Sequence, residues 1–202
     1  MPTTTCEEDT PSHGGHALQP VVAESMTLVS ATERRLAVEH WLLSTHPAPG
    51  HPRIRLEWQE HGVAMLRLGA LFSAVRLPGD LVLAASDCPG EAAEVDAFLD
   101  EALNGGPVIC DPRGRRYYAL TPPGLPDSWQ QAADDWRALG VDLLGCATYL
   151  GVPRPDAVEL DIQAYGPYWS VPISSVARLC APLDLARLIA VGERRMSEEV
   201  EA

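Results

Sequence analysis

The sequence predicts an α+β fold (mixed α/β), in which a small and mostly antiparallel sheet is flanked by helices. Segments with helical periodicity alternate with short β-prone runs, and several of those runs are separated only by turn signals. The chain has 202 residues, of which 46% are hydrophobic, and this suffices for one domain with a real core. We therefore expect a single α+β domain over residues 29–196.

Both ends of the chain lack the pattern of a packed domain. Residues 1–28 are rich in Thr, Pro, Gly and Glu without hydrophobic periodicity, so we expect a flexible N-terminal tail. The acidic residues 197–202 are expected to fray. No apolar run approaches the ~20 residues that cross a bilayer, and neither a secretory signal nor a CxxC pair is found. These features predict a cytoplasmic protein with reduced cysteines and no membrane partner.

The first half of the domain is expected to hold a helix, a hairpin and a further strand. Thr32 is a suitable N-cap for a helix that would place Leu36, His40 and Leu43 on one face. After a proline-containing loop, the polar turn Gln59–Gly62 would join two β-prone runs into a hairpin. The expected elements are a helix over 33–43, strands over 54–58, 63–68 and 71–78, and a short helix over 79–85.

The second half is expected to begin with an amphipathic helix that Asn104–Gly106 terminates. The apolar stripe of this helix consists of Val95, Phe98, Leu99, Ala102 and Leu103. The later expected elements are strands over 107–110 and 116–120, a helix capped by Asp127 and closed by Gly140, strands over 146–153 and 167–173, and a last helix opened by Pro182.

The segment Asp111-Pro112-Arg113-Gly114 has the composition of a type I turn between two strands. Asp at the first position bonds back to the backbone, Pro at the second presets φ, and Gly suits the fourth. The sequence therefore predicts a hairpin whose tip carries a concentration of positive charge.

Arginines beside aromatic residues can bind single-stranded nucleic acid by phosphate pairing and base stacking. The candidate contacts are Arg113, Arg115, Arg116 and Tyr117. Against this, the net charge of −13 repels phosphate, and alternation along a strand would point Arg115 and Arg116 to opposite faces. The alternative is a solvated structural hairpin with Asp111 as the partner of its arginines.

No other motif predicts chemistry strongly. Cys6, His13 and His16 lie close in the tail, where they would bind metal only adventitiously, and Cys110 has no recognisable base. Glu159 and Asp161 would share a face if their segment were a strand, as in two-metal polymerase sites, whereas the neighbouring prolines favour a solvated loop. We expect no cofactor and assign no catalytic residue.

A series of blocks resembles a known family. LFSAVRLP, a helix, GGPVICDPRGRRYYALTPPG, LLGCATYLGVPRP and YWSVP occur in an order similar to the later part of actinobacterial bifunctional DNA primase/polymerase N-terminal (prim-pol) domains. The similarity covers roughly residues 70 to 172. It implies an α+β core, in which the family pairs acidic residues and a histidine around divalent ions for nucleotidyl transfer. Glu159 and Asp161 lie outside the matching position, so no catalytic residue is transferred from the family.

These observations lead to three functional hypotheses. The first is a non-catalytic, prim-pol-like binding protein that contacts nucleic acid through the arginine–tyrosine hairpin. The second is a regulatory or scaffold protein that binds another protein and has no nucleic-acid role. The third is a metal-dependent nucleotidyltransferase that uses Glu159 and Asp161.

Overall fold

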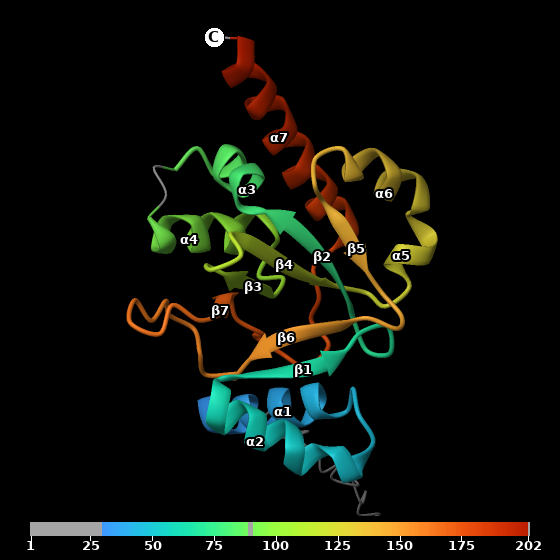
Figure 1. Ribbon diagram of the computed structural model, residues 1–202, viewed down its shortest axis with the longest axis vertical. Helices are drawn as coiled ribbons and strands as arrows, with labels where there is room; N and C mark the ends of the chain where they lie inside the picture. Colours follow the sequence, from blue (N-terminus) through green and yellow to red (C-terminus); the bar gives the residue numbers. More distant parts are fainter. Residues whose placement is uncertain (1–29, 89–90, 202) are drawn as a thin grey trace, which may run out of the picture.

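The computed structural model describes residues 30–88 and 91–201. A five-stranded antiparallel sheet of order β5-β2-β4-β3-β7 forms its centre, and β1 pairs with β6 in a separate antiparallel ribbon (Figure 1). The predicted α+β class, with antiparallel sheets flanked by helices, is confirmed. The expected tail over residues 1–28 lies outside the described residues, as do Cys6, His13 and His16.

Pairs of helices alternate with pairs of strands along most of the chain. The helices are α1 (Ala31–Leu43), α2 (His51–His61), α3 (Gly79–Ser86), α4 (Ala92–Ala102), α5 (Leu125–Ser128), α6 (Gln130–Arg137) and α7 (Pro182–Glu201), with a 3₁₀ turn η1 (Ala48–Gly50) before α2. The strands are β1 (Val63–Arg67), β2 (Ser73–Pro78), β3 (Val108–Asp111), β4 (Arg116–Thr121), β5 (Asp142–Leu144), β6 (Tyr149–Pro153) and β7 (Tyr168–Val171).

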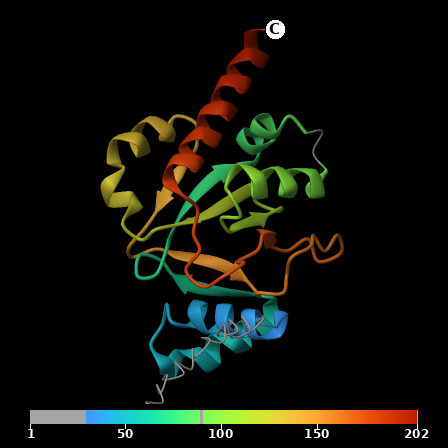
Figure 2. The same ribbon diagram turned by 180° about the vertical axis from the view of Figure 1, so that it is seen from behind.

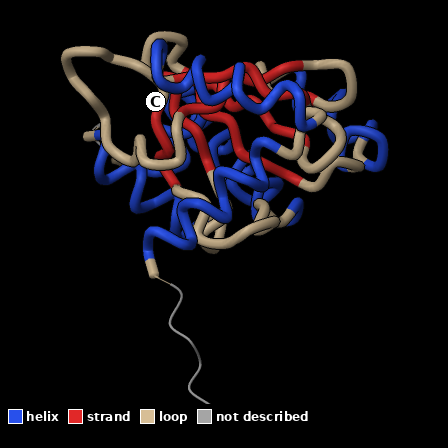
Figure 3. Tube along the Cα trace, turned by 90° about the horizontal axis from the view of Figure 1, so that it is seen from below, coloured by secondary structure: helices blue, strands red, loops and turns tan. Residues whose placement is uncertain are grey.

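The five-stranded sheet is buried on both faces. Figures 1 and 2 show α3, α4 and α7 at one end of the molecule and α1 and α2 at the other, with the strands between them, and Figure 3 shows the same strands from below. Because side chains alternate along a strand, neighbouring apolar residues enter different cores. One core, with α3, α4 and α7, receives Val75, Leu77, Val108, Ala119 and Val171. The other, with α1, α2, β1 and β6, receives Ala74, Ile109, Leu120 and Trp169.

The expected strand over 54–58 is wrong, because this segment belongs to α2. The spacing of Ile54, Leu56 and Trp58 fits an alternating strand, but Ile54 and Trp58 are also four residues apart on one helical face. In the structure Ile54 and Trp58 are buried and Leu56 is 50% exposed. Pro52 in the first turn and Gly62 with a φ of +71° at the C-cap delimit the helix. Strand β1 therefore pairs with β6, with Val63 opposite Pro153.

Several helix boundaries also differ from expectation. Ser30, rather than Thr32, caps α1: its hydroxyl accepts from the Glu33 amide at 3.1 Å while the Glu33 carboxylate accepts from the Ser30 amide at 2.7 Å. Asp127 lies within α5 and does not cap the next helix. Of the predicted face of α1, Leu43 is buried, but Leu36 and His40 are exposed because the helix buries Val38 and Leu42 instead. Helix α7 continues to Glu201, so residues 197–201 are helical.

The other predicted elements are present in the structure. Strands β2, β3, β4, β6 and β7 and helices α3, α4 and α7 lie where the patterns placed them. The stripe of α4 packs as expected, with Val95, Leu99 and Leu103 buried. The short strand β5, which pairs with β2, was not predicted.

Candidate functional site: a pocket beside the β3–β4 hairpin

A pocket of about 260 Å³ lies beside the β3–β4 hairpin. Its walls come from α3, the start of α4, the hairpin and the loop 154–167, which appears in orange next to β7 in Figures 1 and 2. The lining residues are Gly79, Leu83, Ala92, Cys110, Asp111, Pro112, Arg115, Arg116, Tyr117, Leu160, Tyr165 and Tyr168. We call this the hairpin pocket. Its volume is just under the usual range for small-molecule sites, so it suits one side chain or one base of a larger ligand.

The turn after Asp111 forms the rim of the hairpin pocket, and its backbone hydrogen bond joins the Arg115 amide to the Pro112 carbonyl at 3.4 Å, one residue later than predicted. The Gly114 amide donates to Asp111 Oδ1 at 3.2 Å, which is the back-bonding expected of an Asp at the first turn position. Arg115 follows with a φ of +49°, and its carbonyl accepts from the Gly79 amide at 2.8 Å. A Cβ atom on Gly79 would lie 2.9 Å from that carbonyl oxygen, so glycine allows α3 to begin against the hairpin.

The three arginines of the hairpin have separate environments. Arg113 donates from Nε to the Tyr165 carbonyl at 3.0 Å and from Nη2 to the Ala164 carbonyl at 2.8 Å. Arg115 pairs with Asp80 of α3 at 2.6 Å, with both side chains largely exposed. The Arg116 side chain has no hydrogen bond or ion pair with another described residue. The predicted contact residues are therefore close in sequence but do not form one positive patch.

Tyr117 and Tyr118 point to opposite faces of β4, because Tyr117 packs against one core and Tyr118 against the other. Tyr118 shares a face with Arg116, and the positive charges of Arg76 and Arg116 partly offset the rise in the Tyr118 pKa that burial causes. Tyr117 is turned to the other face, where it lines the hairpin pocket. The structure thus brings Arg115, Arg116 and Tyr117 to the pocket wall but directs Arg113 to the loop.

A row of three polar side chains crosses three strands at the pocket floor. Cys110 is paired with Tyr117 on one side and with Tyr168 on the other. Burial raises the pKa of Cys110 to about 11, although its contacts with the two tyrosine hydroxyls act in the opposite direction. Burial likewise raises the pKa of both tyrosines above the ordinary range. All three groups are neutral at pH 7, so the floor offers hydroxyl and thiol donors and no nucleophilic thiolate.

Asp96 of α4 contacts Tyr168, one end of this row. The Tyr168 hydroxyl donates to it, 3.2 Å from each carboxylate oxygen, and the Ser170 hydroxyl donates to Oδ1. A bulge in β7 leaves Ser170 without a partner in β3, because Val108 is opposite Val171 while the next residue is opposite Trp169. Burial raises the Asp96 pKa, and the two hydroxyl donors partly offset that rise.

Sequence reasoning did not identify Asp96, Tyr168 or Ser170. A signal for Asp96 was present: it occupies the same helical stripe as Ala92, Leu99 and Leu103, where a carboxylate must find buried partners. Those partners lie more than 70 residues away, and nothing in the local pattern points to them.

The loop 154–167 contains no helix or strand but is fixed at several points. Trp169 donates from its amide to the Ala157 carbonyl at 2.7 Å and from Nε1 to the Arg154 carbonyl at 3.0 Å. Asp161 Oδ1 accepts from the amides of Gln163 and Ala164, and these bonds lower the Asp161 pKa. Together with the Arg113 bonds, these contacts hold the loop beside the hairpin.

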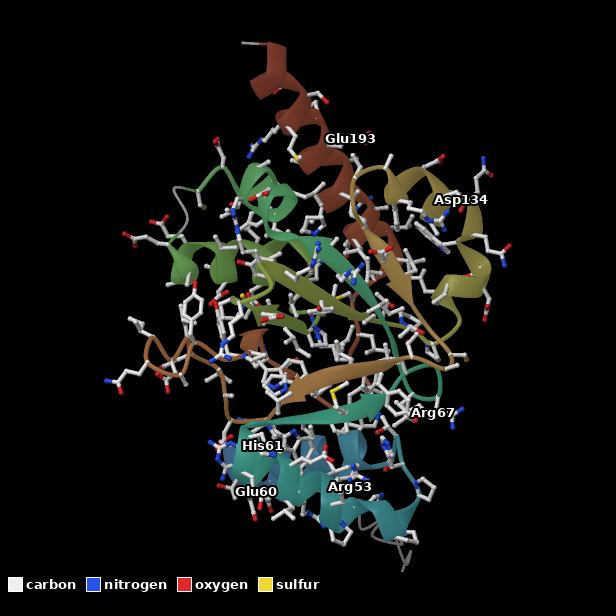
Figure 4. All side chains as sticks on the ribbon, viewed as in Figure 1. Arg53, Glu60, His61, Arg67, Asp134 and Glu193 are labelled. Atoms are coloured by element: carbon white, nitrogen blue, oxygen red, sulfur yellow. The ribbon has the colours of Figure 1, made fainter. Side chains whose placement is uncertain are left out.

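The metal hypothesis requires Glu159 and Asp161 to share one face of a strand, but both lie in the loop 154–167. The two residues are exposed and are not on a strand, and Asp161 Oδ1 is occupied by its own turn. Within residues 30–88 and 91–201, no group of three or more His, Cys, Asp and Glu side chains could hold a metal ion. The described histidines belong to α1, α2 and the connection between them, and Figure 4 shows His61 at that end of the molecule.

Comparisons with protein-family models, with curated proteins and with solved structures found no match for this chain. Among the described residues, no helix has the length and apolar character needed to cross a membrane. The site is thus defined by its own geometry: a small pocket with neutral donors at its floor, tyrosine and arginine at its rim, and a fixed loop beside it.

Proposed function

We propose that this chain is a non-catalytic binding protein that recognises a partner polypeptide through the hairpin pocket and the adjoining loop 154–167. The observation that carries the proposal is the exposure of apolar side chains on a loop that the protein holds in place. Ile162 is 82% exposed, and Val158 and Tyr165 are 45% and 46% exposed. Such side chains lose little conformational entropy on binding when the backbone is already fixed.

The length of the loop 154–167 also favours a role in binding. Connections of this length without secondary structure are uncommon in compact domains, and those that are ordered are often binding loops. Tyr165 and Leu160 belong both to the loop and to the pocket wall. An apolar side chain of a partner could therefore enter the pocket while its backbone lies against the loop, which is a common way for an anchor residue to bind.

Single-stranded nucleic acid is the second candidate, and the resemblance to prim-pol domains favours it. Tyr117 and the 46% exposed Tyr165 line the hairpin pocket and could stack on a base. The Arg115–Asp80 pair is exposed enough for phosphate to compete with it, and Arg116 has no partner in the described part of the chain. The divergent directions of the arginines and the net charge of −13 place this candidate second.

Photocrosslinking tests the proposal. A benzophenone amino acid at Ile162 should crosslink to a polypeptide in cells, whereas the same group at Glu193 or Asp134, on other elements of the fold, should not (Figure 4). The crosslink should disappear when Leu160→Asp is added at the pocket wall, with the folded state checked by circular dichroism. Equal crosslinking from all three positions, or none from Ile162, would contradict the proposal.

A separate measurement decides the second candidate. If nucleic acid is the ligand, a labelled oligo-dT strand should bind with an affinity that falls as salt rises and that Arg115→Glu and Arg116→Glu both reduce. If neither substitution changes the affinity for oligo-dT, the hairpin is not the binding site.

A further inference from the structure

Two adjoining pockets on the side of α1 and α2 form a groove that the hairpin does not reach. One, of about 300 Å³, is lined by Arg35, Arg55 and Arg154 together with Glu39 and Asp156. The other, of about 370 Å³, is lined by apolar groups that include Val38, Val158, Pro172 and Ile173. Arg35 and Pro155 line both pockets, so the two are continuous. We call them together the arginine groove.

The arginine groove is a positive region on a strongly negative chain. Among the described residues, its charged half is lined by three arginines, Arg35, Arg55 and Arg154, and by two carboxylates, Glu39 and Asp156. Arg55 Nε pairs with Glu39 at 2.8 Å, and Arg154 Nε pairs with Asp156 at 3.2 Å. Arg35 is exposed, and its side chain has no hydrogen bond or ion pair with any described residue. An unmatched guanidinium therefore stands where the charged and apolar parts meet.

The apolar half of the groove distinguishes between anionic ligands. A nucleic-acid strand would need aromatic rings on which its bases could stack, but Trp58 and Trp169 are only 4% and 1% exposed. The carboxylates of Glu39 and Asp156 would also repel a continuous row of phosphates. A peptide carrying separate carboxylates and apolar side chains fits both halves, because each carboxylate can form a bidentate pair with one guanidinium.

We propose that the arginine groove binds an acidic segment of a partner polypeptide, with a carboxylate on Arg35 and an apolar side chain against Val38 and Val158. The groove shares Arg154, Pro155 and Val158 with the loop 154–167 but no residue with the lining of the hairpin pocket, so loss of peptide binding on Arg35→Glu, outside that loop, tests the groove independently of the function proposed above. Other surfaces of this negatively charged chain would repel the acidic segment. Charge would therefore direct the segment to the groove.

Fluorescence anisotropy with a short labelled peptide of alternating glutamate and leucine tests the proposal. The wild-type chain should bind this peptide, with an affinity that decreases as salt rises, and should not bind the same peptide with lysine in place of glutamate. Arg35→Glu combined with Arg154→Glu should weaken binding at least tenfold. Arg53→Glu is the matched control, because Arg53 belongs to α2 with an 82% exposed side chain and does not line the groove (Figure 4). It should change affinity by less than about twofold.

A second variant tests the apolar half without altering an arginine. Val158→Asp should weaken binding of the peptide about tenfold and leave the thermal unfolding midpoint nearly unchanged, because Val158 is half exposed on the loop. The proposal is overturned if the acidic peptide does not bind, if Arg53→Glu weakens binding as much as the groove variant does, or if unlabelled oligo-dT displaces the peptide at an equal concentration.

Discussion

The hydroxyl group of Tyr168 lies 3.2 Å from both carboxylate oxygens of Asp96, and Ser170 donates to the same carboxylate. This arrangement satisfies a half-buried acid with two neutral donors and without a cation. Burial destabilises the charged form of Asp96 by more than the two hydroxyl donors stabilise it, so the Asp96 pKa is raised.

We expect the stability of the protein to depend on the protonation of Asp96. Because the pKa is higher in the folded chain than in the unfolded chain, the folded state binds the proton more readily. The contribution of Asp96 to stability therefore declines as pH rises from the ordinary carboxyl pKa, about 4, through the raised value. Asp96→Asn keeps an acceptor for both hydroxyls and removes this dependence.

The measurement is urea unfolding of wild type and Asp96→Asn between about pH 4 and pH 7. The variant should gain stability relative to wild type as pH rises. Asp100→Asn is the matched control, because Asp100 is exposed on the same helix. A difference between wild type and Asp96→Asn that stays constant with pH would show that the Asp96 carboxyl titrates alike in both states.

The cysteines should differ sharply in reactivity. At pH 8 a thiol with a pKa of about 11 is a thiolate in about one molecule in a thousand, and Cys110 is in addition buried. Cys180 is buried with its pKa raised to about 12. Cys146 is exposed. Of these three, iodoacetamide should therefore modify Cys146 and leave Cys110 and Cys180 intact until urea is added, as peptide mass spectrometry would show. Early modification of Cys110 would mean that the hairpin opens in the native state.

Arg113 should act as a structural anchor. Arg113→Ala removes two bonds to loop carbonyls, and we expect the amides of Gln163 and Ala164 to exchange hydrogen about threefold faster or more. Hydrogen-exchange mass spectrometry would detect the change. Arg137→Ala is the control, because Arg137 makes only an exposed pair with Asp134 on α6. Unchanged exchange in the loop would contradict this role and show that the hydrogen bonds of Trp169 and Asp161 hold the loop without Arg113.

Gly106 should not tolerate a side chain. A Cβ atom there would lie 2.7 Å from Cys180 Sγ and 2.8 Å from Cys180 Cα. We expect Gly106→Ala to lower the free energy of unfolding by about 1–3 kcal/mol, the usual cost of overpacking. At Gly124 a Cβ would meet nothing within 4 Å, so Gly124→Ala should change stability by less than about 0.5 kcal/mol in denaturant unfolding. Equal effects at both positions would contradict this account.

Local patterns predicted most of the central sheet because its determinants are local. The Asp111 turn is specified by four adjacent residues, and the strands on either side of it form as expected. The opposite directions of Tyr117 and Tyr118 follow from strand geometry alone. By contrast, a short run such as 54–58 fits two periodicities, and only its partners in the core decide between them.

The site was less predictable because its members meet through tertiary packing. Asp96 and Ser170 are 74 residues apart, and the bulge that orients Ser170 depends on the pairing of β3 with β7. The separate roles of Arg113 and Arg115 could not be read from their spacing either, since their partners belong to the loop and to α3.

The loop 154–167 contributes Arg154, Pro155 and Val158 to the arginine groove and Leu160 and Tyr165 to the hairpin pocket. One covalent segment thus forms part of two concave surfaces. A ligand that shifts this segment at one surface changes the free energy of binding at the other, and thermodynamic linkage makes that effect the same in both directions. The strength of the coupling depends on how firmly Trp169 and Arg113 hold the segment between the two surfaces.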